Sequence, residues 1–244
     1  MCVFNTRFTM FNPAGFINFL KKPQYESIER KDTHVIITTI KIYLLALLFI
    51  GLINSLNLTI LKTFFTIPID ESLEVPEPFK RHLWAYLALV VIYSPIMEEV
   101  IFRLPLIFDP VNISLSISVL IALIVHKVSN GILPILTFLM LFFLLNRLAI
   151  IYKLNFLSFW KKNFKYIFYL LSLTFGLVHI SNYKYVVLSQ YLMAPILILP
   201  QLLLGFILSY TRLYYKKGFL ICILIHCLMN LVSMSVYLLE YCNK

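Results

Sequence analysis

Two adjacent acids and an arginine lie inside a stretch of this chain that is otherwise apolar enough to cross a membrane. Residues 93–105 read YSPIMEEVIFRLP, which places Glu98, Glu99 and Arg103 within the apolar segment 82–107. An ionisable group near the centre of a bilayer costs roughly 2.5–3.5 kcal/mol on insertion scales, so such groups usually face a polar interior and pair with one another. A chain with this segment must therefore fold so that other helices enclose the charged side chains.

Helical spacing separates the roles of the two acids. At about 100° per residue, Glu99 and Arg103 lie one turn apart on the same stripe, whereas Glu98 points about a quarter-turn away. We therefore expect Glu99 and Arg103 to form a structural ion pair. Glu98 has no cation at this spacing and is the better candidate for a general base. Pro95 cannot donate to the carbonyl of Val91, which predicts a kink one turn before the acids.

The composition indicates a membrane protein. The chain is 61% hydrophobic and 13% charged over 244 residues, whereas soluble domains are roughly 45–50% apolar. We predict an all-α fold, a polytopic transmembrane helix bundle of about seven spans with a buried polar active site. Spans of sufficient length lie at about 36–60, 82–107, 112–127, 132–151, 165–182, 187–213 and 218–241. The number becomes six or eight if the segment with Pro195 and Pro200 is split or a short helix is re-entrant.

Three regions follow from the positions of these spans. Residues 1–35 are expected to form a cytoplasmic N-terminal segment, in which 10–22 is typical of an interfacial helix. Residues 36–82 hold the first span and an acidic, proline-containing external loop. Residues 83–241 form the core that carries the acidic motif. In this core the third and fourth spans are predicted to form a hairpin, and the basic, aromatic stretch 152–165 to connect two spans along the cytoplasmic interface.

The basic residues report on topology. The chain has 21 Lys and Arg against 11 Asp and Glu, a net charge of +10, but the cations lie between apolar spans and form no aromatic-interleaved groove, so no nucleic-acid partner is expected. A model with the N-terminus inside places thirteen cations on the cytoplasmic side and six on the other, as the positive-inside rule requires. We therefore predict a multi-pass integral membrane protein with a cytoplasmic N-terminus. The compact chain favours a bacterial plasma membrane.

Two later spans each contain a histidine with a partner one helical turn away. His179 follows Phe175 by four residues, and Asn230 follows His226 by four, so each pair lies on one helix face. Phe175 gives His179 an apolar wall, and Gly176 lets another helix approach closely. With the acids of the second span, three helices supply a carboxylate, two imidazoles and an amide. This set can activate a water molecule and stabilise an oxyanion.

Three motifs, Glu-Glu-x-x-x-Arg, Phe-x-x-x-His and His-x-x-x-Asn, thus occur in this order in the hydrophobic spans. In this the chain resembles the CAAX protease and bacteriocin-processing (CPBP, Abi) family of intramembrane endopeptidases. The resemblance covers roughly residues 83–235, so 83–241 would be a CPBP-type catalytic transmembrane core. One departure is Leu104-Pro105, where many family members have glycine directly after the arginine.

The resemblance implies a reaction and a division of roles. The chain would hydrolyse a peptide bond with a water molecule activated by Glu98 and His179, while His226 and Asn230 would hold the oxyanion. The supporting residues would be Glu99, Arg103 and Phe175. The expected partners are the lipid bilayer and a membrane-associated or leader-bearing peptide. The identity of the substrate and the oligomeric state stay open.

A zinc-dependent mechanism is the main alternative, because Glu98, His179 and His226 offer the three protein ligands of a catalytic zinc site. The chain contains no His-Glu-x-x-His sequence, and Asn230 beside His226 suits an oxyanion hole better than a metal shell, so no cofactor is expected. A non-catalytic membrane scaffold or immunity protein is a second alternative, which the intact motifs disfavour. A proton-coupled transporter would be supported by inverted repeats of broken helices, and the sequence shows none.

Overall fold

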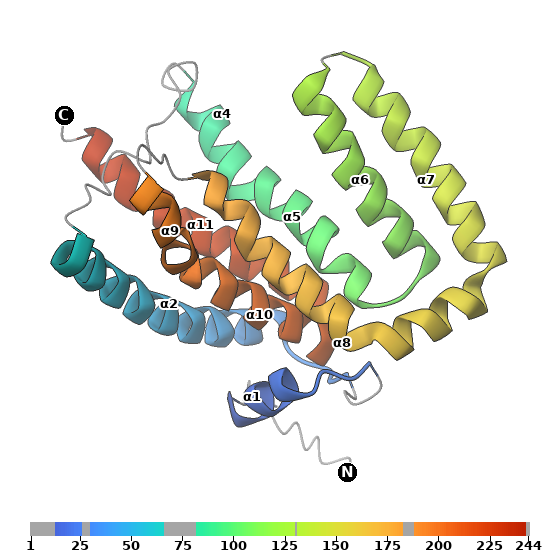
Figure 1. Cartoon of the computed structure of the whole chain (residues 1–244), viewed down its shortest axis with the longest axis horizontal. Coiled ribbons are helices and arrows are strands. Elements are labelled where there is room, and N and C mark those ends of the chain that lie inside the picture. The colour runs from blue at the N-terminus through green and yellow to red at the C-terminus, as the bar shows by residue number, and fades with distance from the viewer. Residues whose placement is uncertain (1–12, 26–29, 66–81, 130, 183–187, 243–244) are drawn as a thin grey trace, which may run out of the picture.

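The computed structural model describes residues 13–25, 30–65, 82–129, 131–182 and 188–242. Within these ranges the regular elements are helices (Figure 1), and the predicted all-α class is confirmed. Six helical stretches among the described residues are long and apolar enough to span a membrane, which makes the chain a multi-pass membrane protein. They are Val35–Asn57, Leu83–Leu106, Pro110–Val128, Leu133–Ile151, Lys153–Asn182 and Gly218–Ser235.

The expected seventh span is absent from this set because the segment 187–213 is split. Its described part forms α9 (Leu188–Leu197) and α10 (Leu199–Tyr214), with Ile198 between the two helices. Pro200 lies in the first turn of α10, where its missing N–H leaves no helical hydrogen bond unmade. The two prolines of this segment had already indicated that such a break would reduce the number of spans.

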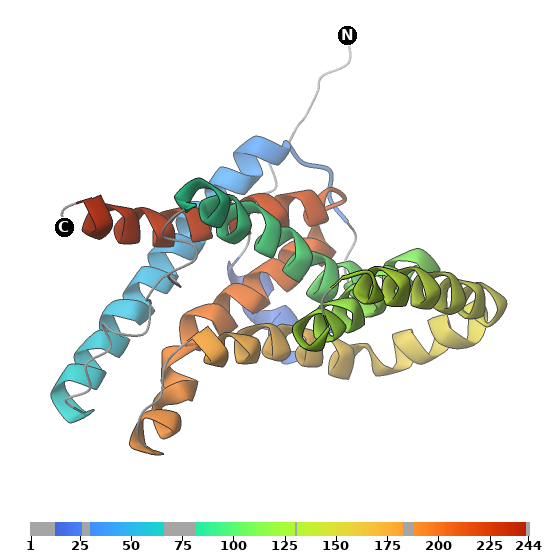
Figure 2. The same ribbon diagram turned by 90° about the horizontal axis from the view of Figure 1, so that it is seen from above.

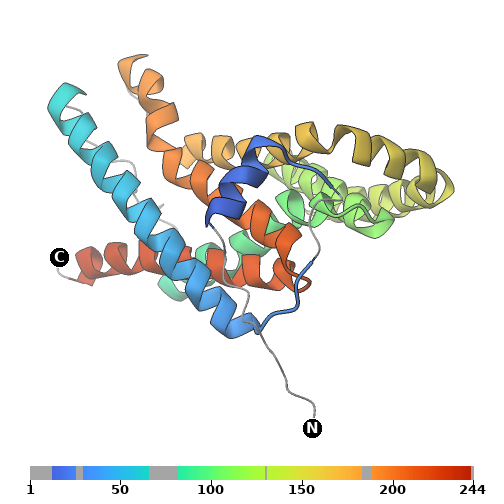
Figure 3. The ribbon, with the colours of Figure 1, turned by 90° about the horizontal axis from the view of Figure 1, so that it is seen from below.

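The two N-terminal helices pack against the inner part of the bundle. α1 (Pro13–Lys21) lies beside α10 in Figure 3, where Phe16 packs edge-on against Tyr210 with ring centroids 5.4 Å apart. α2 (Val35–Phe65) contains the first predicted span and extends past its expected end near residue 60. The acidic residues of the predicted external loop lie outside the described residues. The membrane-surface position of α1 stays a prediction.

The acidic motif lies on one continuous helical stretch that contains a π-turn. Its elements are α4 (Leu83–Ala88), the π-helix η1 (Leu89–Tyr93), α5 (Ser94–Phe102) and the short 3-10 helix η2 (Leu104–Leu106). The backbone N–H of Ser94 donates to the carbonyl of Leu89, five residues back. Pro95 follows directly and has no N–H to continue the ladder. The irregularity predicted at this proline therefore takes the form of a π-turn in the preceding residues.

The third and fourth spans form the predicted hairpin, α6 (Pro110–Val128) and α7 (Leu133–Ile151). The hairpin projects to one side of the bundle, away from α2, in Figures 1 and 2. Gly131 in its turn has φ +87°, a left-handed conformation that glycine adopts without strain. Ser116 on α6 donates to the carbonyl of Ile101 on α5 at 2.7 Å, which joins the hairpin to the motif helix.

The helix α8 (Lys153–Val178) includes the stretch that was predicted to connect two spans along the cytoplasmic interface. Residues 153–165 of that stretch form the first half of α8, and their position at the interface stays a prediction. No proline or glycine interrupts the helix before Gly176, and lysine and asparagine side chains do not stop a helix. In Figure 1 the first half runs at an angle to the second half, which continues into η3 (His179–Asn182).

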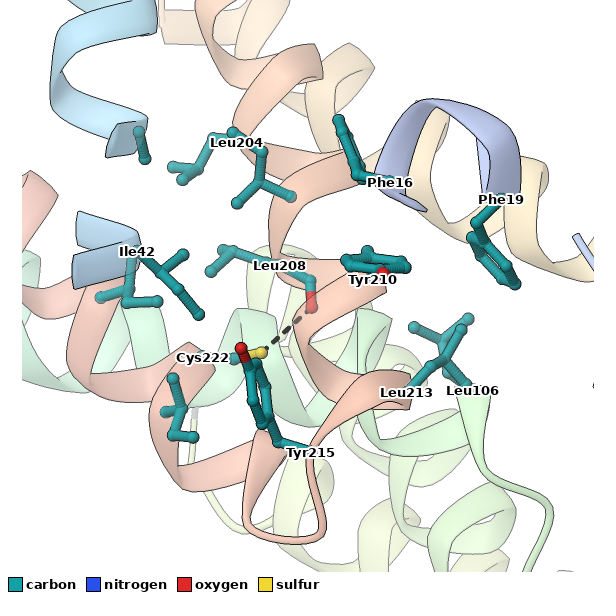
Figure 4. Close-up of a cluster of buried hydrophobic side chains, with 14 of the residues drawn as sticks. Phe16, Phe19, Ile42, Leu106, Leu204, Leu208, Tyr210, Leu213, Tyr215 and Cys222 are labelled. Carbon is teal, nitrogen blue, oxygen red and sulfur yellow. Dashed lines mark hydrogen bonds between the residues drawn. The ribbon is translucent and has the colours of Figure 1, made fainter. Parts of the chain in front are cut away.

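The main hydrophobic core surrounds α10, which packs between α2, α8 and the last helix, α11 (Gly218–Cys242). Figure 4 shows Leu204, Leu208 and Tyr210 of α10 inside this cluster. The thiol of Cys222 on α11 donates to the carbonyl of Leu208, with sulfur and oxygen 3.1 Å apart. α10 is thus a buried helix, although it is too short to be counted as a span.

Small residues allow α8 and α10 to cross closely. A Cβ added at Gly176 would lie 2.4 Å from the side chain of Leu202, so the predicted close approach at this glycine is confirmed. A Cβ at Gly205 would lie 2.8 Å from the carbonyl oxygen of Ser172. The Ser172 hydroxyl also donates to that of Ser209 across the crossing at 2.8 Å. This contact fixes the end of α8, where the first motif histidine begins η3.

Candidate active site

Three helical segments bring the two motif histidines to the free oxygen of Glu98. Oε2 of Glu98 on α5 lies 3.7 Å from Nε2 of His179 and 3.7 Å from Nε2 of His226 on α11. The other carboxylate oxygen, Oε1, accepts a hydrogen bond from the Ser94 hydroxyl at 2.7 Å. Oε2 is buried and accepts no hydrogen bond from the described residues. It therefore keeps its lone pairs for a small molecule that enters between the histidines.

A backbone carbonyl determines which ring nitrogen of His179 carries a hydrogen. Nδ1 of this ring lies 2.7 Å from the carbonyl oxygen of Phe175, one turn earlier on α8. A carbonyl oxygen only accepts, so Nδ1 carries the hydrogen, and in a neutral ring Nε2 then holds a lone pair. That lone pair faces Glu98. Two acceptors, one carboxylate oxygen and one imidazole nitrogen, thus converge on the same place.

His226 is held by the second acid of the motif. Its Nδ1 lies 2.8 Å from Oε1 of Glu99, and the ring is almost fully buried. Oε2 of Glu99 lies 3.5 Å from Nε of Arg103, and neither of these side chains is exposed. The structure thus contains the ion pair expected from helical spacing. It also adds a contact to His226 that the sequence reasoning missed, because the two residues lie 127 positions apart.

One aromatic ring touches three of the charged or titratable groups. The Phe175 ring lies 5.0 Å from the ring centre of His179 and 5.5 Å from that of His226. The guanidinium carbon of Arg103 lies 3.8 Å from the centre of the same ring, within range of a cation–π interaction. Phe175 therefore forms the apolar wall predicted for His179 and extends it to the other two residues.

Asn230 lies one turn after His226 on α11, but its amide points to the backbone of the motif helix. Nδ2 donates to the carbonyl oxygen of Val90 in η1 at 2.9 Å. An amide nitrogen has two hydrogens, so one remains for another acceptor. The role of Asn230 in binding an oxyanion stays a prediction. Nothing in the sequence predicted this hydrogen bond except Pro95, which directly follows the π-turn and Ser94.

The expectations about metal stay predictions as well. Among the described residues, no group of three or more His, Cys, Asp and Glu side chains is arranged to hold a metal ion. The zinc set considered from the sequence consists of Glu98, His179 and His226, and Oε2 of Glu98 lies 3.7 Å from Nε2 of each histidine. Metal analysis of the purified protein decides between the two mechanisms.

The fold and the site define a polytopic helical membrane protein with a glutamate and two histidines enclosed by its helices. A comparison with protein families identifies the type. The model of the Type II CAAX prenyl endopeptidase Rce1-like family matches residues 80–232, which is more than half of the chain. The chain belongs to this family of membrane proteases, and the resemblance inferred from the three motifs is confirmed. The curated proteins and the solved structures contained no match.

Proposed function

We propose that this chain is an intramembrane endopeptidase in which Glu98 acts as the general base. The observation that carries the proposal is the convergence of Glu98 Oε2 and Nε2 of His179, one a buried oxygen with no hydrogen-bond donor among the described residues and the other a nitrogen with a lone pair. A water molecule between two acceptors gives each of them one hydrogen. Its own lone pairs then face away from both acceptors, as a nucleophile requires.

The reaction follows from this arrangement. The water oxygen forms a bond to the scissile carbonyl carbon while its proton passes to Glu98, and the carbonyl oxygen becomes an oxyanion. The proton on Glu98 then passes to the leaving amine as the C–N bond breaks. His226 and Asn230 face the oxyanion as hydrogen-bond donors. His226 donates from Nε2 only when its ring carries both protons, and the contact between Nδ1 and Glu99 supplies the counter-ion for that cation.

The substrate class is a peptide that reaches the site from the membrane. The family description names a CAAX prenyl endopeptidase, whereas a bacterial chain would act on a membrane-associated or leader-bearing peptide. The side chains of Glu98 and His179 keep 22% and 16% of their surface exposed, so a backbone segment can reach them. The reaction acts on the peptide bond itself and not on a particular side chain. We therefore propose that an apolar segment next to the scissile bond supplies most of the binding energy.

Hydrolysis by the purified protein in lipid vesicles tests the proposal. Two fluorogenic peptides are compared, one with a farnesylated CAAX end and one with an apolar leader, each in water enriched in ¹⁸O. We expect cleavage of at least one peptide, one ¹⁸O in the new carboxyl group, and no cleavage by the Glu98→Gln variant. Equal cleavage by the parent and Glu98→Gln would assign the activity to a contaminant or to another base. Cleavage of neither peptide by folded parent protein would overturn the peptidase assignment.

We also propose that the N-terminus faces the cytoplasm, on the strength of the distribution of cations. Lys217, in the turn between α10 and α11, then lies on the cytoplasmic side, because its neighbour Lys216 pairs with Asp32 in the segment before α2, and Val128, at the end of α6, lies on the opposite side. Both residues are exposed. In a cysteine-free background, Val128→Cys should react with an impermeant thiol reagent added to intact cells, and Lys217→Cys only after lysis. The reverse pattern would invert the topology.

A further inference from the structure

The carbonyl of Val90 has lost both of the backbone donors that a helix would offer it. In an α-helix its partner is the N–H of Ser94, but that group donates to the carbonyl of Leu89 instead. In a π-helix its partner would be the N–H of the residue five positions ahead. That residue is Pro95, which has no backbone N–H. The π-turn η1 therefore leaves the carbonyl of Val90 without a backbone partner, directly before the helix that carries the acids.

The side chain of Asn230 takes the place of the missing donor. Its Nδ2 lies 2.9 Å from the Val90 oxygen, across the contact between α11 and the motif helix. In an apolar span no water is at hand to satisfy a carbonyl, so a helical segment with such a gap requires a partner from a neighbouring helix. The hydrogen bond from Asn230 therefore stabilises the π-turn.

The π-turn in turn determines where the acids point. An extra residue in one helical turn rotates everything after it by about 100° relative to what precedes it. Ser94 is the first residue after the turn, and its hydroxyl holds Oε1 of Glu98 at 2.7 Å. A helix that returned to α-helical register at this point would present Ser94 and Glu98 on a different face with respect to α4.

We infer that Asn230 is a positioning residue: by donating to Val90 it holds the π-turn that aims Glu98 at the two histidines. The effect of this bond on turnover rests on the proposed function, but the bond itself and its effect on folding do not. Replacement of Pro95 by alanine provides the matching perturbation. It restores an N–H, and Val90 then gains a backbone donor in either register, from residue 94 or from residue 95.

A double-mutant cycle over Pro95→Ala and Asn230→Ala tests the inference, with melting temperature in detergent as the first readout. In the parent background Asn230→Ala should lower the melting temperature by about 2–4 °C, the shift that one buried hydrogen bond makes in a chain of this size. In the Pro95→Ala background the same change should lower it by less than half as much. Ser233→Ala is the control, because that hydroxyl donates within α11 to Met229; it should act equally in both backgrounds.

The side-chain amide of Asn230 offers a second readout that does not depend on activity. In protein labelled with ¹⁵N-asparagine, this NH₂ signal is assigned by its loss in Asn230→Ala or, if that variant does not fold, in Asn230→Ser. We expect slow hydrogen exchange for it in the parent and at least tenfold faster exchange in Pro95→Ala. Equal melting shifts in both backgrounds together with unchanged exchange would overturn the inference. An inactive parent that still shows the coupling would refute the proposed function and leave the inference standing.

Discussion

Glu99→Gln is the sharpest test of the buried charges beneath the site. The side chains of Glu99 and Arg103 have no exposed surface, and Glu99 also holds Nδ1 of His226 at 2.8 Å. The change keeps the shape of the side chain but removes its charge, so the Arg103 guanidinium stays buried without a counter-ion. Removal of one partner of a buried ion pair costs about 3–5 kcal/mol. For a chain of this size that is a fall in melting temperature on the order of 6–20 °C.

The neighbouring acid provides the matched control. Glu98→Gln is the same chemical change one residue earlier, at a side chain that is 22% exposed and whose titratable neighbours among the described residues are the two histidines rather than an arginine. The amide oxygen can still accept from Ser94, so we expect a melting temperature within about 2 °C of the parent together with complete loss of hydrolysis. Both variants are heated in the same detergent, and the folded fraction is measured by size-exclusion chromatography. If Glu99→Gln melts with the parent, or Glu98→Gln falls as far as Glu99→Gln, the separation of the two acids is wrong.

Three further changes probe the packing, the base and the metal question. Gly205→Ala should destabilise the protein by about 1–3 kcal/mol, because its Cβ meets a carbonyl oxygen at 2.8 Å, whereas Gly51→Ala in α2, with nothing within 4 Å, should be neutral or stabilising in the same thermal assay. Ser94→Ala releases Oε1 of Glu98 and should lower kcat about tenfold with little change in melting temperature; an unchanged kcat in steady-state kinetics would contradict the orienting role of this hydroxyl. Hydrolysis should survive exhaustive chelation, and a zinc content near one per chain that tracks activity would replace the metal-free mechanism with the zinc one.

Contacts within a single helix were predictable from the sequence, and contacts between helices were not. The spacing of four residues placed Arg103 beside Glu99 and Phe175 beside His179, and the structure contains both pairs. The contact of His226 with Glu99 depends on how α11 crosses α5, which no local pattern encodes. The motifs nevertheless implied that these spans meet, because isolated charges in a membrane need partners.

Helix boundaries were hardest to predict in the two places where local signals compete. The lysines and asparagines of 152–165 look like an interfacial connection, but they also allow a helix, and α8 runs through them. The prolines of 187–213 allow either a kinked span or two helices, and the structure has the break. Pro95 explains the π-turn only in part. The proline removes a backbone hydrogen-bond donor, but it does not determine which helical turn widens in response.

The recognised family region and the folding unit of this protein are different lengths of chain. The match begins at residue 80, yet α2 contributes Ile42, Ala46 and Ile50 to the cluster around α10, and α1 contributes Phe16. A fragment cut to 80–232 would expose the apolar surface of α10 and α11 that α1 and α2 cover to lipid or detergent. Loss of activity in such a fragment would therefore report a missing wall of the bundle, and a screen for the smallest active form should keep both N-terminal helices.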